Sequence, residues 1–275
     1  MACGRKEARD GAAQESVPTW REPVTGMEFR YVPAGRFRMG TGSGELPRQP
    51  DETPHEVTLT RGFYLGRYEV TQTEWSRVMG GNPSQFPGCP SCPVETVSYD
   101  DIQRYIRRPA ELSHGNGFRL PTEAEWEYAC RSGTHTAFAT GAGLTSQQAN
   151  YDGRYPLPGA PPGQYLGRPA KVGSYPPNPW GFYDLHGNVW EWVEDWYGDY
   201  PAGPVTDPRG PARGSGRRVW DARGGDWGWK RVIRGGSWYF NADSCRCALR
   251  YTHAPADSGF SLGFRLVREV PEAAR

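Results

Sequence analysis

The chain is punctuated throughout by glycine and proline, which number 36 and 26 among its 275 residues. Proline interrupts helices and central strands, and glycine allows backbone turns that other residues avoid. The mean hydropathy of −0.75 indicates that an aliphatic core is scarce, but 11 Trp, 15 Tyr and 10 Phe can bury large areas. The sequence therefore predicts a compact, loop-rich domain with an aromatic core and little long helix.

Charge and hydropathy exclude two broad classes of partner. Acidic and basic residues are interspersed, and the formal net charge is +1, so no basic stripe favours nucleic acid or a membrane surface. No apolar run approaches the roughly 20 residues that span a bilayer. We therefore expect no nucleic-acid partner and no direct membrane span.

The opening residues 1–20 are polar and are expected to form a flexible tail ahead of a single domain over residues 21–275. Cys3 follows Ala2, which resembles the arrangement left when a lipoprotein signal is trimmed before the lipidated cysteine. The alternative is the frayed terminus of a cytoplasmic protein. Two locations stay open: the cell surface, through a lipidated Cys3, and the cytoplasm.

Three segments carry helix-start signals. A short helix is opened by Thr71 or Thr73, and a second has Ser98 as its N-cap. The clearest signal is the pair Thr122 and Glu125, which are spaced as a capping box.

Strand-like runs lie on both sides of these helices. Apolar and polar residues alternate over residues 27–40, and Pro-Ala-Gly at 33–35 suits a turn in the middle of this run. The pattern predicts a β-hairpin. The runs HEVTLTRGFYLGRYEVT, RVIRGGSWYF and GFRLVRE are also strand-like. Residues 134–179 and 201–228 are rich in Gly and Pro and are expected to be long loops, which in compact domains are often functional.

Six motifs occur in order along the chain: MEFRYVPAGRFRMG, FYLGRYEVTQTEW, FRLPTEAEWEYACR, YDLHGNVWEWVEDWY, RVIRGGSW and LGFRLVRE. Together they resemble the formylglycine-generating-enzyme (sulfatase-modifying-factor) family over residues 25–269. The resemblance implies a C-type-lectin-like α+β fold that is loop-rich, with small antiparallel sheets and a few short helices. Fold alone does not fix function.

The resemblance also indicates where catalysis would occur. Oxidases of the family convert a substrate cysteine to formylglycine with two active-site cysteines that bind copper. The matching positions in this chain are Phe240 and Cys245. Phenylalanine cannot ligate copper or exchange disulfides, so we expect no catalytic residues, no copper and no enzymatic activity.

The remaining cysteines are expected to be structural. The resemblance implies a disulfide between Cys130 and Cys247, or at least close thiols, with two reduced buried thiols as the alternative in a cytoplasmic protein. Cys89 and Cys92 form one CxxC without a second ligand pair, which favours a small loop disulfide over a zinc site. Cys245 is then left as a free thiol, at the surface or at the edge of the core.

Family oxidases carry structural calcium, and the resemblance implies a Ca²⁺ site with two carboxylates and two backbone oxygens in a turn, as a hard cation prefers. The residues at the matching positions are Asp184, Gly187, Val189 and Glu191. A second family site maps to Asn150 and is weaker, because Gln164 replaces an acid there; Asp152 nearby could compensate. The alternative at both places is a turn held by hydrogen bonds alone.

Segment 239–261 has an unusual composition. Trp, Met, Lys, Glu and Gln are absent from it, although they occur elsewhere in the chain. Six of its residues are assigned to a scaffold: Cys245, Arg246, Cys247, Ala248, Arg250 and Pro255. Every other residue of the segment can be encoded by a codon that differs from the asparagine codon AAC only where AAC has an adenine. This pattern resembles the diversified region of diversity-generating-retroelement variable proteins, in which template adenines are mutated and the product is a C-type-lectin-like domain.

The sequence therefore predicts a non-enzymatic binding protein that uses segment 239–261 as a diversified surface for a protein or other macromolecular ligand, with small polar and aromatic residues suited to adaptable contacts. The alternatives are a copper-dependent formylglycine-generating oxidase and an accessory domain of the same family. The expected ligand-binding residues are Tyr239, Phe240, Asn241, Asp243, Ser244, Leu249, Tyr251, Thr252, His253, Asp257, Ser258, Gly259, Phe260 and Ser261.

Overall fold

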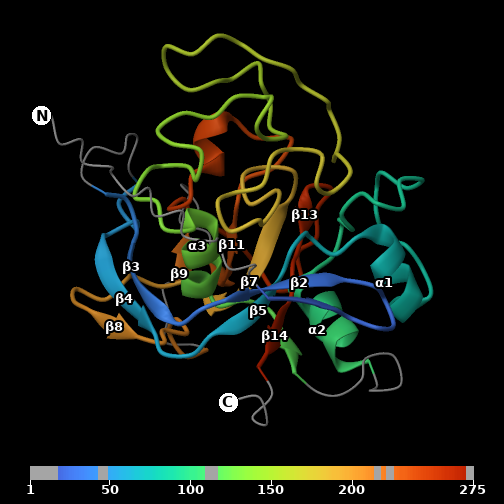
Figure 1. The fold of residues 1–275 in the computed structure, drawn as a ribbon, viewed down its shortest axis with the longest axis horizontal. Coiled ribbons are helices and arrows are strands. Elements are labelled where there is room, and N and C mark those ends of the chain that lie inside the picture. Colours follow the sequence, from blue (N-terminus) through green and yellow to red (C-terminus); the bar gives the residue numbers. More distant parts are fainter. Residues whose placement is uncertain (1–17, 43–48, 109–116, 214–217, 221–225, 271–275) are drawn as a thin grey trace, which may run out of the picture.

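The computed structural model describes residues 18–42, 49–108, 117–213, 218–220 and 226–270. These residues form short helices and small sheets that are joined by long loops (Figure 1). The first strand, β1, begins at Thr19, slightly before the domain boundary expected at residue 21. Most of the predicted tail, including Cys3, lies outside the described residues.

The helices begin where the sequence predicts, because each has a capping box. In each box a hydroxyl accepts from the backbone N–H three residues on, and the acidic side chain there accepts from the N–H of the cap. The pairs are Thr71 and Glu74 for α1 (Gln72–Met79), Ser98 and Asp101 for α2 (Tyr99–Arg107), and Thr122 and Glu125 for α3 (Glu123–Arg131). Helix α1 ends at Gly80, whose φ of 80° is left-handed.

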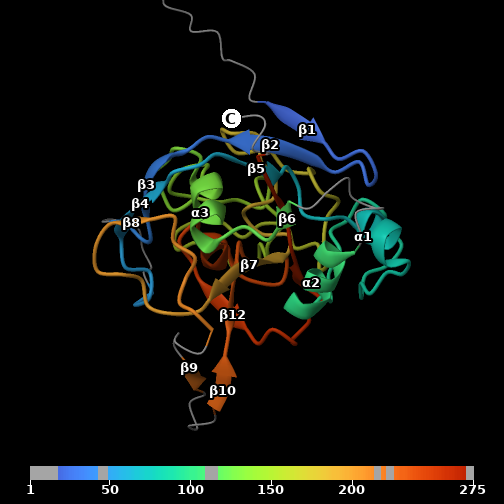
Figure 2. The same ribbon diagram turned by 90° about the horizontal axis from the view of Figure 1, so that it is seen from below.

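The strands form small sheets in which most neighbours are antiparallel. One sheet has the order β1 (Thr19–Arg21), β2 (Glu28–Val32), β5 (Phe63–Gly66), β14 (Val267–Glu269), β6 (Phe118–Arg119). A second has the order β12 (Tyr251–His253), β11 (Arg231–Arg234), β7 (Trp190–Trp196), β13 (Leu262–Gly263), and a third the order β3 (Gly35–Met39), β4 (His55–Leu59), β8 (Val205–Thr206). Strands β9 (Arg218–Trp220) and β10 (Asp226–Trp229) form a ribbon that projects from the body (Figure 2).

The hairpin predicted over residues 27–40 is wrong. Strand β2 pairs with β1 and β5, whereas β3 pairs with β4 in a different sheet. Pro33 lies between β2 and β3, and its fixed φ and missing N–H interrupt the strand pairing there. Apolar and polar residues still alternate in these strands because each strand buries one face. The buried residues include Phe29 and Val32 on β2 and Phe37 and Met39 on β3.

The interior is rich in aromatic and, less expectedly, arginine side chains. Trp126, Trp192, Phe29, Phe138, Phe182 and Phe264 are among the largest fully buried side chains, together with Arg234, Arg246 and Arg265. Each of these arginines contacts a buried glutamate. Ion pairs therefore lie within the core beside the rings that the composition predicts.

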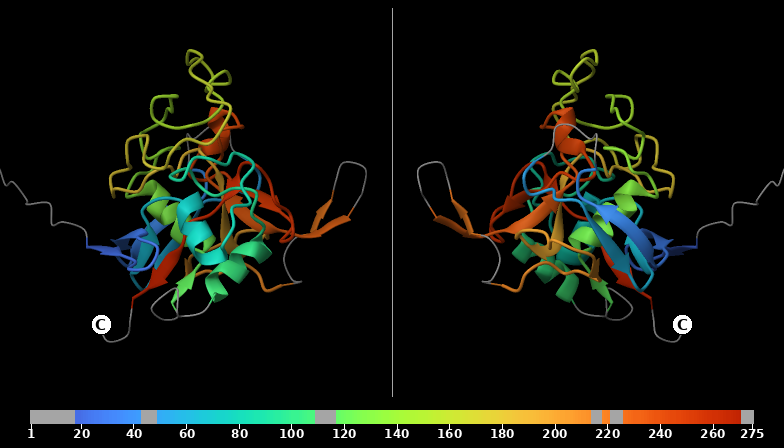
Figure 3. Two further views of the ribbon diagram at one scale, coloured as in Figure 1. Left: turned by 90° about the vertical axis from the view of Figure 1, so that its right-hand side faces the viewer. Right: turned by 90° about the vertical axis from the view of Figure 1, so that its left-hand side faces the viewer.

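The sheet that contains β7 and β11 positions segment 239–261. The chain leaves β11, forms the short 3-10 helix η1 (Ala242–Cys245), returns as β12 beside β11, and reaches β13, which pairs parallel to β7. The loops over residues 134–179 lie around η1 at one end of the molecule (Figures 1 and 3). The first part of segment 239–261 is therefore held between the central sheet and these loops, and its later part returns along the edge of the sheet as β12.

Candidate functional site: segment 239–261 and its pocket

Backbone hydrogen bonds attach segment 239–261 to several parts of the fold. The carbonyl of Phe240 accepts from Asp152 N at 2.8 Å, and Cys247 N donates to Ala137 O at 2.8 Å. Farther along, the carbonyl of Gly259 accepts from Thr96 N at 2.9 Å. These bonds involve main-chain atoms alone, so the path of the segment does not depend on which side chains it carries there.

Exposure separates the predicted ligand-binding residues from the predicted scaffold. Tyr239 and Tyr251 are 53% and 47% exposed. Partly or fully exposed residues of the expected binding set are Tyr239, Phe240, Asn241, Asp243, Ser244, Tyr251, Thr252, His253, Asp257, Ser258, Gly259 and Phe260. The scaffold residues Cys245, Arg246, Cys247, Ala248 and Arg250 are buried, and Pro255 is partly exposed. Leu249 and Ser261 differ from the expectation, because both are buried.

Two scaffold arginines tie the segment to the core through paired hydrogen bonds. Arg246 Nη1 and Nη2 each lie 2.9 Å from an oxygen of Glu52, and its Nε donates to Asp243 Oδ1 at 2.7 Å. Arg250 Nε and Nη2 donate to the two oxygens of Glu123 at 2.7 and 2.9 Å. Two parallel hydrogen bonds constrain the relative orientation of the two side chains, and the opposite charges strengthen the contact. These arginines therefore hold the segment in place.

An open pocket of about 470 Å³ lies between segment 239–261 and β7. Four aromatic residues line it, together with the carboxylates of Asp51 and Asp243. The rings belong to Trp190, Tyr197, Phe240 and Tyr251. The Trp190 ring lies 5.4 Å from that of Phe240, edge to face, and 5.6 Å from that of Tyr251, stacked. The pocket size is typical of ligand sites.

A second group of rings supports the exposed part of the segment. Trp238 is 4% exposed, and its ring lies 5.4 Å from that of Tyr239 and 5.5 Å from that of Phe260. Phe86 and Tyr165 contact Trp238 from outside the segment. The aromatic surface of the segment is therefore packed on fixed rings instead of extending freely into solvent.

The two positions expected to match the family's catalytic thiols, Phe240 and Cys245, face different environments. The Phe240 ring lines the pocket, whereas Cys245 is fully buried among apolar residues that include Phe138 and Tyr151. Burial raises the pKa of the Cys245 thiol well above its usual range. Because the thiolate is the reactive form, Cys245 is inert in this structure, and it does not lie at the surface.

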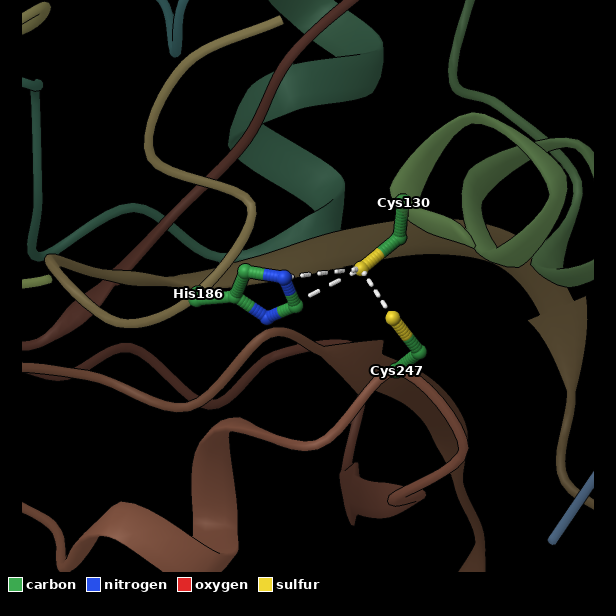
Figure 4. Close-up of side chains that lie close together, drawn as sticks. All are labelled: Cys130, His186 and Cys247. Carbon is green, nitrogen blue, oxygen red and sulfur yellow. Dashed lines mark hydrogen bonds between the residues drawn. The ribbon is translucent and has the colours of Figure 1, made fainter. Parts of the chain in front are cut away.

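Cys130 and Cys247 meet in the core, where α3 approaches segment 239–261 (Figure 4). Their Sγ atoms lie 2.9 Å apart as two free, fully buried thiols. Burial raises the pKa of Cys130. The predicted disulfide between these residues stays a prediction.

His186 lies beside these thiols, with Cys130 Sγ 3.9 Å from both ring nitrogens (Figure 4). Ala139 N donates to His186 Nε2 at 3.0 Å, so Nδ1 carries the proton and donates to Cys245 O at 2.8 Å. Burial lowers the pKa of His186 to about 4. Both ring nitrogens are thus already engaged, and the group of His186, Cys130 and Cys247 does not present a metal site.

Cys89 and Cys92 form the predicted loop disulfide, which is confirmed. The bond lies in the loop between α1 and α2, and Cys92 O accepts from Gln72 N at 2.9 Å at the start of α1. The disulfide therefore supports the beginning of that helix.

The residues expected to bind calcium lie at a buried acidic group that includes one residue the sequence did not indicate. Burial raises the pKa of Asp184 to about 6, while the N–H of Gly173, which donates to Asp184 Oδ2 at 2.7 Å, favours the charged form. Burial and the neighbouring charge of Asp184 raise the pKa of Glu69, and Glu69 Oε2 has no partner among the described residues. Both oxygens of Glu191 accept from Arg265 at 2.7 Å.

This donor set fits a hard cation. Arg265 and Trp126 already engage Glu191, so Glu69 and Asp184 are the carboxyl groups left for a divalent ion, which would favour their charged forms. Gly187 closes the turn with φ at 89°, and a Cβ there would lie 2.3 Å from Asn150 O. Glu69 thus joins the residues that the resemblance implied. Its only sequence signal is an acid between Tyr68 and Val70, three residues after the end of β5.

The second, weaker calcium position is occupied by internal contacts. The Asn150 amide nitrogen donates to Asn188 Oδ1 and to Arg168 O, both at 3.1 Å. The Asp152 carboxylate pairs with Arg154 at 2.7 Å. Asp152 is therefore engaged by a cationic side chain, and Asn150 acts as a structural bridge between loops.

The fold and site define a C-type-lectin-like domain that presents a variable-looking segment over a central sheet. The chain belongs to the family described as "Sulfatase-modifying factor enzyme 1-like domain", which matches residues 14–270. This confirms the family and fold expected from the six motifs.

Two kinds of relative are similar to the chain. A formylglycine-generating enzyme of Streptomyces coelicolor is 30% identical, with 94% of each chain covered. The solved structure of Treponema denticola variable protein 1 superposes with a TM-score of 0.72 at 28% identity, over 92% of this chain and 99% of that one. PvdO from Pseudomonas aeruginosa superposes with a TM-score of 0.71 at 27% identity, over 94% and 100%. None of the described helices is long and apolar enough to cross a membrane.

Proposed function

We propose that this protein is a non-enzymatic ligand-binding protein whose segment 239–261 is a diversified binding surface for a protein or other macromolecule. The similarity to Treponema denticola variable protein 1 supports this assignment. In such a protein the fixed fold presents the segment, and changes in exposed side chains alter which ligand is bound. A place at the cell surface through a lipidated Cys3, where such ligands are met, is part of the same proposal; a cytoplasmic location is the alternative.

The observation that carries the proposal is the division of segment 239–261 by exposure. The positions chosen from residue type alone are partly or fully exposed except Leu249 and Ser261, and the positions assigned to the scaffold are buried except the partly exposed Pro255. Buried positions resist substitution because their neighbours are close-packed. A surface that can change while the core stays constant is what diversification requires.

The test is deep sequencing of this locus across a natural population. We expect substitutions to concentrate at the exposed positions of segment 239–261 and to use only codons that template adenines can generate. The motif NVWEW at residues 188–192 is the internal control and should be invariant. A segment as invariant as this motif would contradict the proposal.

The second candidate is a copper-dependent oxidase or an accessory domain, and the similarity to the Streptomyces coelicolor enzyme favours it. Against the oxidase, the first thiol position carries Phe240, and burial keeps Cys245 protonated. A copper site with one of its two thiolate ligands missing would lose the chemistry. Formation of formylglycine in a cysteine-containing peptide, with copper added, would overturn the non-enzymatic assignment.

We propose further that Ca²⁺ binds beside Asp184 and Glu69 and stabilises the fold. Calcium at 100 times its Kd is expected to raise the free energy of unfolding by about 2.7 kcal/mol over that in EDTA. Glu69→Gln should remove most of this difference and raise the melting temperature in EDTA, because it removes a buried charge. Glu56→Gln, on the exposed face of β4, is the matched control. Equal melting temperatures with calcium and with EDTA would count against the site.

A further inference from the structure

The pocket beside segment 239–261 has walls of two origins. Phe240, Asp243 and Tyr251 belong to the segment. The opposite wall consists of Trp190 and Tyr197, which lie on or directly after β7, together with Asp51, and none of these is in the segment. We call these last three residues the constant wall. If the segment varies, only one side of the pocket changes.

The chemistry of the pocket suits a cation. Tyr197 Oη donates to Asp51 Oδ2 at 2.8 Å, and Asp243 Oδ1 accepts from Arg246 Nε at 2.7 Å. Among the described residues the second oxygen of each aspartate has no hydrogen-bond partner and is available to a ligand. Aromatic faces attract cations through their negative quadrupole, most strongly when water is excluded.

The arginines beside the pocket do not oppose this charge. Arg250 lines the pocket but is 6% exposed and bound to both oxygens of Glu123, and Arg246 is fully buried against Glu52. Each of these two guanidiniums is therefore turned toward a buried glutamate and away from the open side of the pocket. Two carboxylates and the partly or fully exposed rings of Tyr197, Phe240 and Tyr251 remain on the accessible walls, and the buried Trp190 ring supports them from behind.

We propose that this pocket binds the protonated side chain of a lysine or arginine on a protein ligand. The proposal rests on the proposed binding function and names the chemistry of its ligand. Trp190, which also lines the pocket, has an indole N–H with no hydrogen-bond partner among the described residues, so the site lacks one polar contact as it stands. Because the constant wall lies outside the segment, a preference for basic side chains persists when residues 240, 243 and 251 differ.

The experiment is selection of a random dodecapeptide display library on the folded, full-length protein. We expect selected peptides to be enriched in lysine or arginine. Replacing the enriched arginine by citrulline, which keeps the shape and removes the charge, should weaken binding about tenfold or more in calorimetric titrations. Equal affinity of the two peptides would overturn the proposal.

Variants locate the effect. Asp51→Asn combined with Asp243→Asn should abolish the preference for arginine over citrulline, whereas Asp100→Asn, on the exposed face of α2, should leave it unchanged. Because Arg246 keeps its pair with Glu52, the double variant is expected to fold, and its melting temperature checks this. A preference that survives in the double variant would overturn the proposal.

Outcomes for this proposal and for the proposed function are distinguishable. Selected peptides without basic residues that still depend on Tyr239 or Tyr251 would overturn the cation pocket and leave the binding function intact. A library that yields no peptide dependent on segment 239–261, together with an invariant locus in natural populations, would overturn both. Direct titration with N-acetylarginine methylamide, followed by the NMR signal of the Trp190 indole, decides the pocket independently: no shift relative to the citrulline analogue contradicts it.

Discussion

Replacing Arg246 by methionine is expected to lower the free energy of unfolding by about 3–5 kcal/mol, because it leaves Glu52 buried without its cationic partner. Both side chains are fully buried and joined by two hydrogen bonds of 2.9 Å. Urea denaturation measures the change. Adding Glu52→Met should recover most of the loss, since replacing both members of a buried pair by apolar residues is often nearly neutral.

The exposed positions of the same segment provide the matched comparison. Ser258→Asn should change the free energy of unfolding by no more than about 0.5 kcal/mol, since the side chain is exposed. Tyr239→Ser should lower it by about 0.5–1.5 kcal/mol, since its half-exposed ring packs on Trp238 and Phe260. A loss at Tyr239 as large as that at Arg246 would show that the segment is core, and the division on which the proposed function rests would then be wrong.

Oxidation of Cys130 and Cys247 to a disulfide is expected to raise the free energy of unfolding by roughly 4–5 kcal/mol in the chain-entropy description. The link would close a loop with a sequence separation of 117 residues. Because burial disfavours the thiolate of Cys130, the bond should form during folding and only slowly in the folded protein. Refolding with oxidised and reduced glutathione, followed by peptide mapping, tests this.

The control must isolate this pair from the other cysteines. A background of Cys89→Ser and Cys92→Ser removes the loop disulfide, and in it Cys247→Ala should abolish the stability difference between oxidised and reduced protein. Cys245→Ala should leave that difference unchanged, since Cys245 makes no contact with a second sulfur among the described residues. A mapped disulfide that includes Cys245 would contradict the pairing.

Features with a local cause were predictable from the sequence. The starts of α1, α2 and α3 follow from capping pairs three residues apart, and the family follows from ordered motifs. The prediction of a hairpin at residues 27–40 was wrong. Alternation of apolar and polar residues indicates that one face of a strand is buried, but it does not indicate which strand pairs with it. Pro33 divides that run between two sheets.

Only the side of the pocket formed by segment 239–261 was predictable from the sequence. The residue types present in segment 239–261 identified that segment, but Asp51 and Glu69 carry no periodic or motif signal. Asp51 reaches the pocket from a loop, and Glu69 reaches Asp184 across more than a hundred residues of sequence. Such long-range contacts between irregular segments depend on the whole fold. The burial of Arg234, Arg246 and Arg265 was likewise hidden, because arginine is usually a surface residue.

The backbone hydrogen bonds that hold segment 239–261 also affect how many of its sequence variants can fold. Its path is held by N–H and C=O groups that every non-proline residue carries, by buried arginines, and by a few side chains such as Asn241 and Asp257 that accept from nearby backbone N–H groups. A gene rewritten at the other exposed positions would therefore yield folded protein in most descendants. The repertoire open to a lineage would then be limited by how many codons can be rewritten, and less by progeny lost to misfolding.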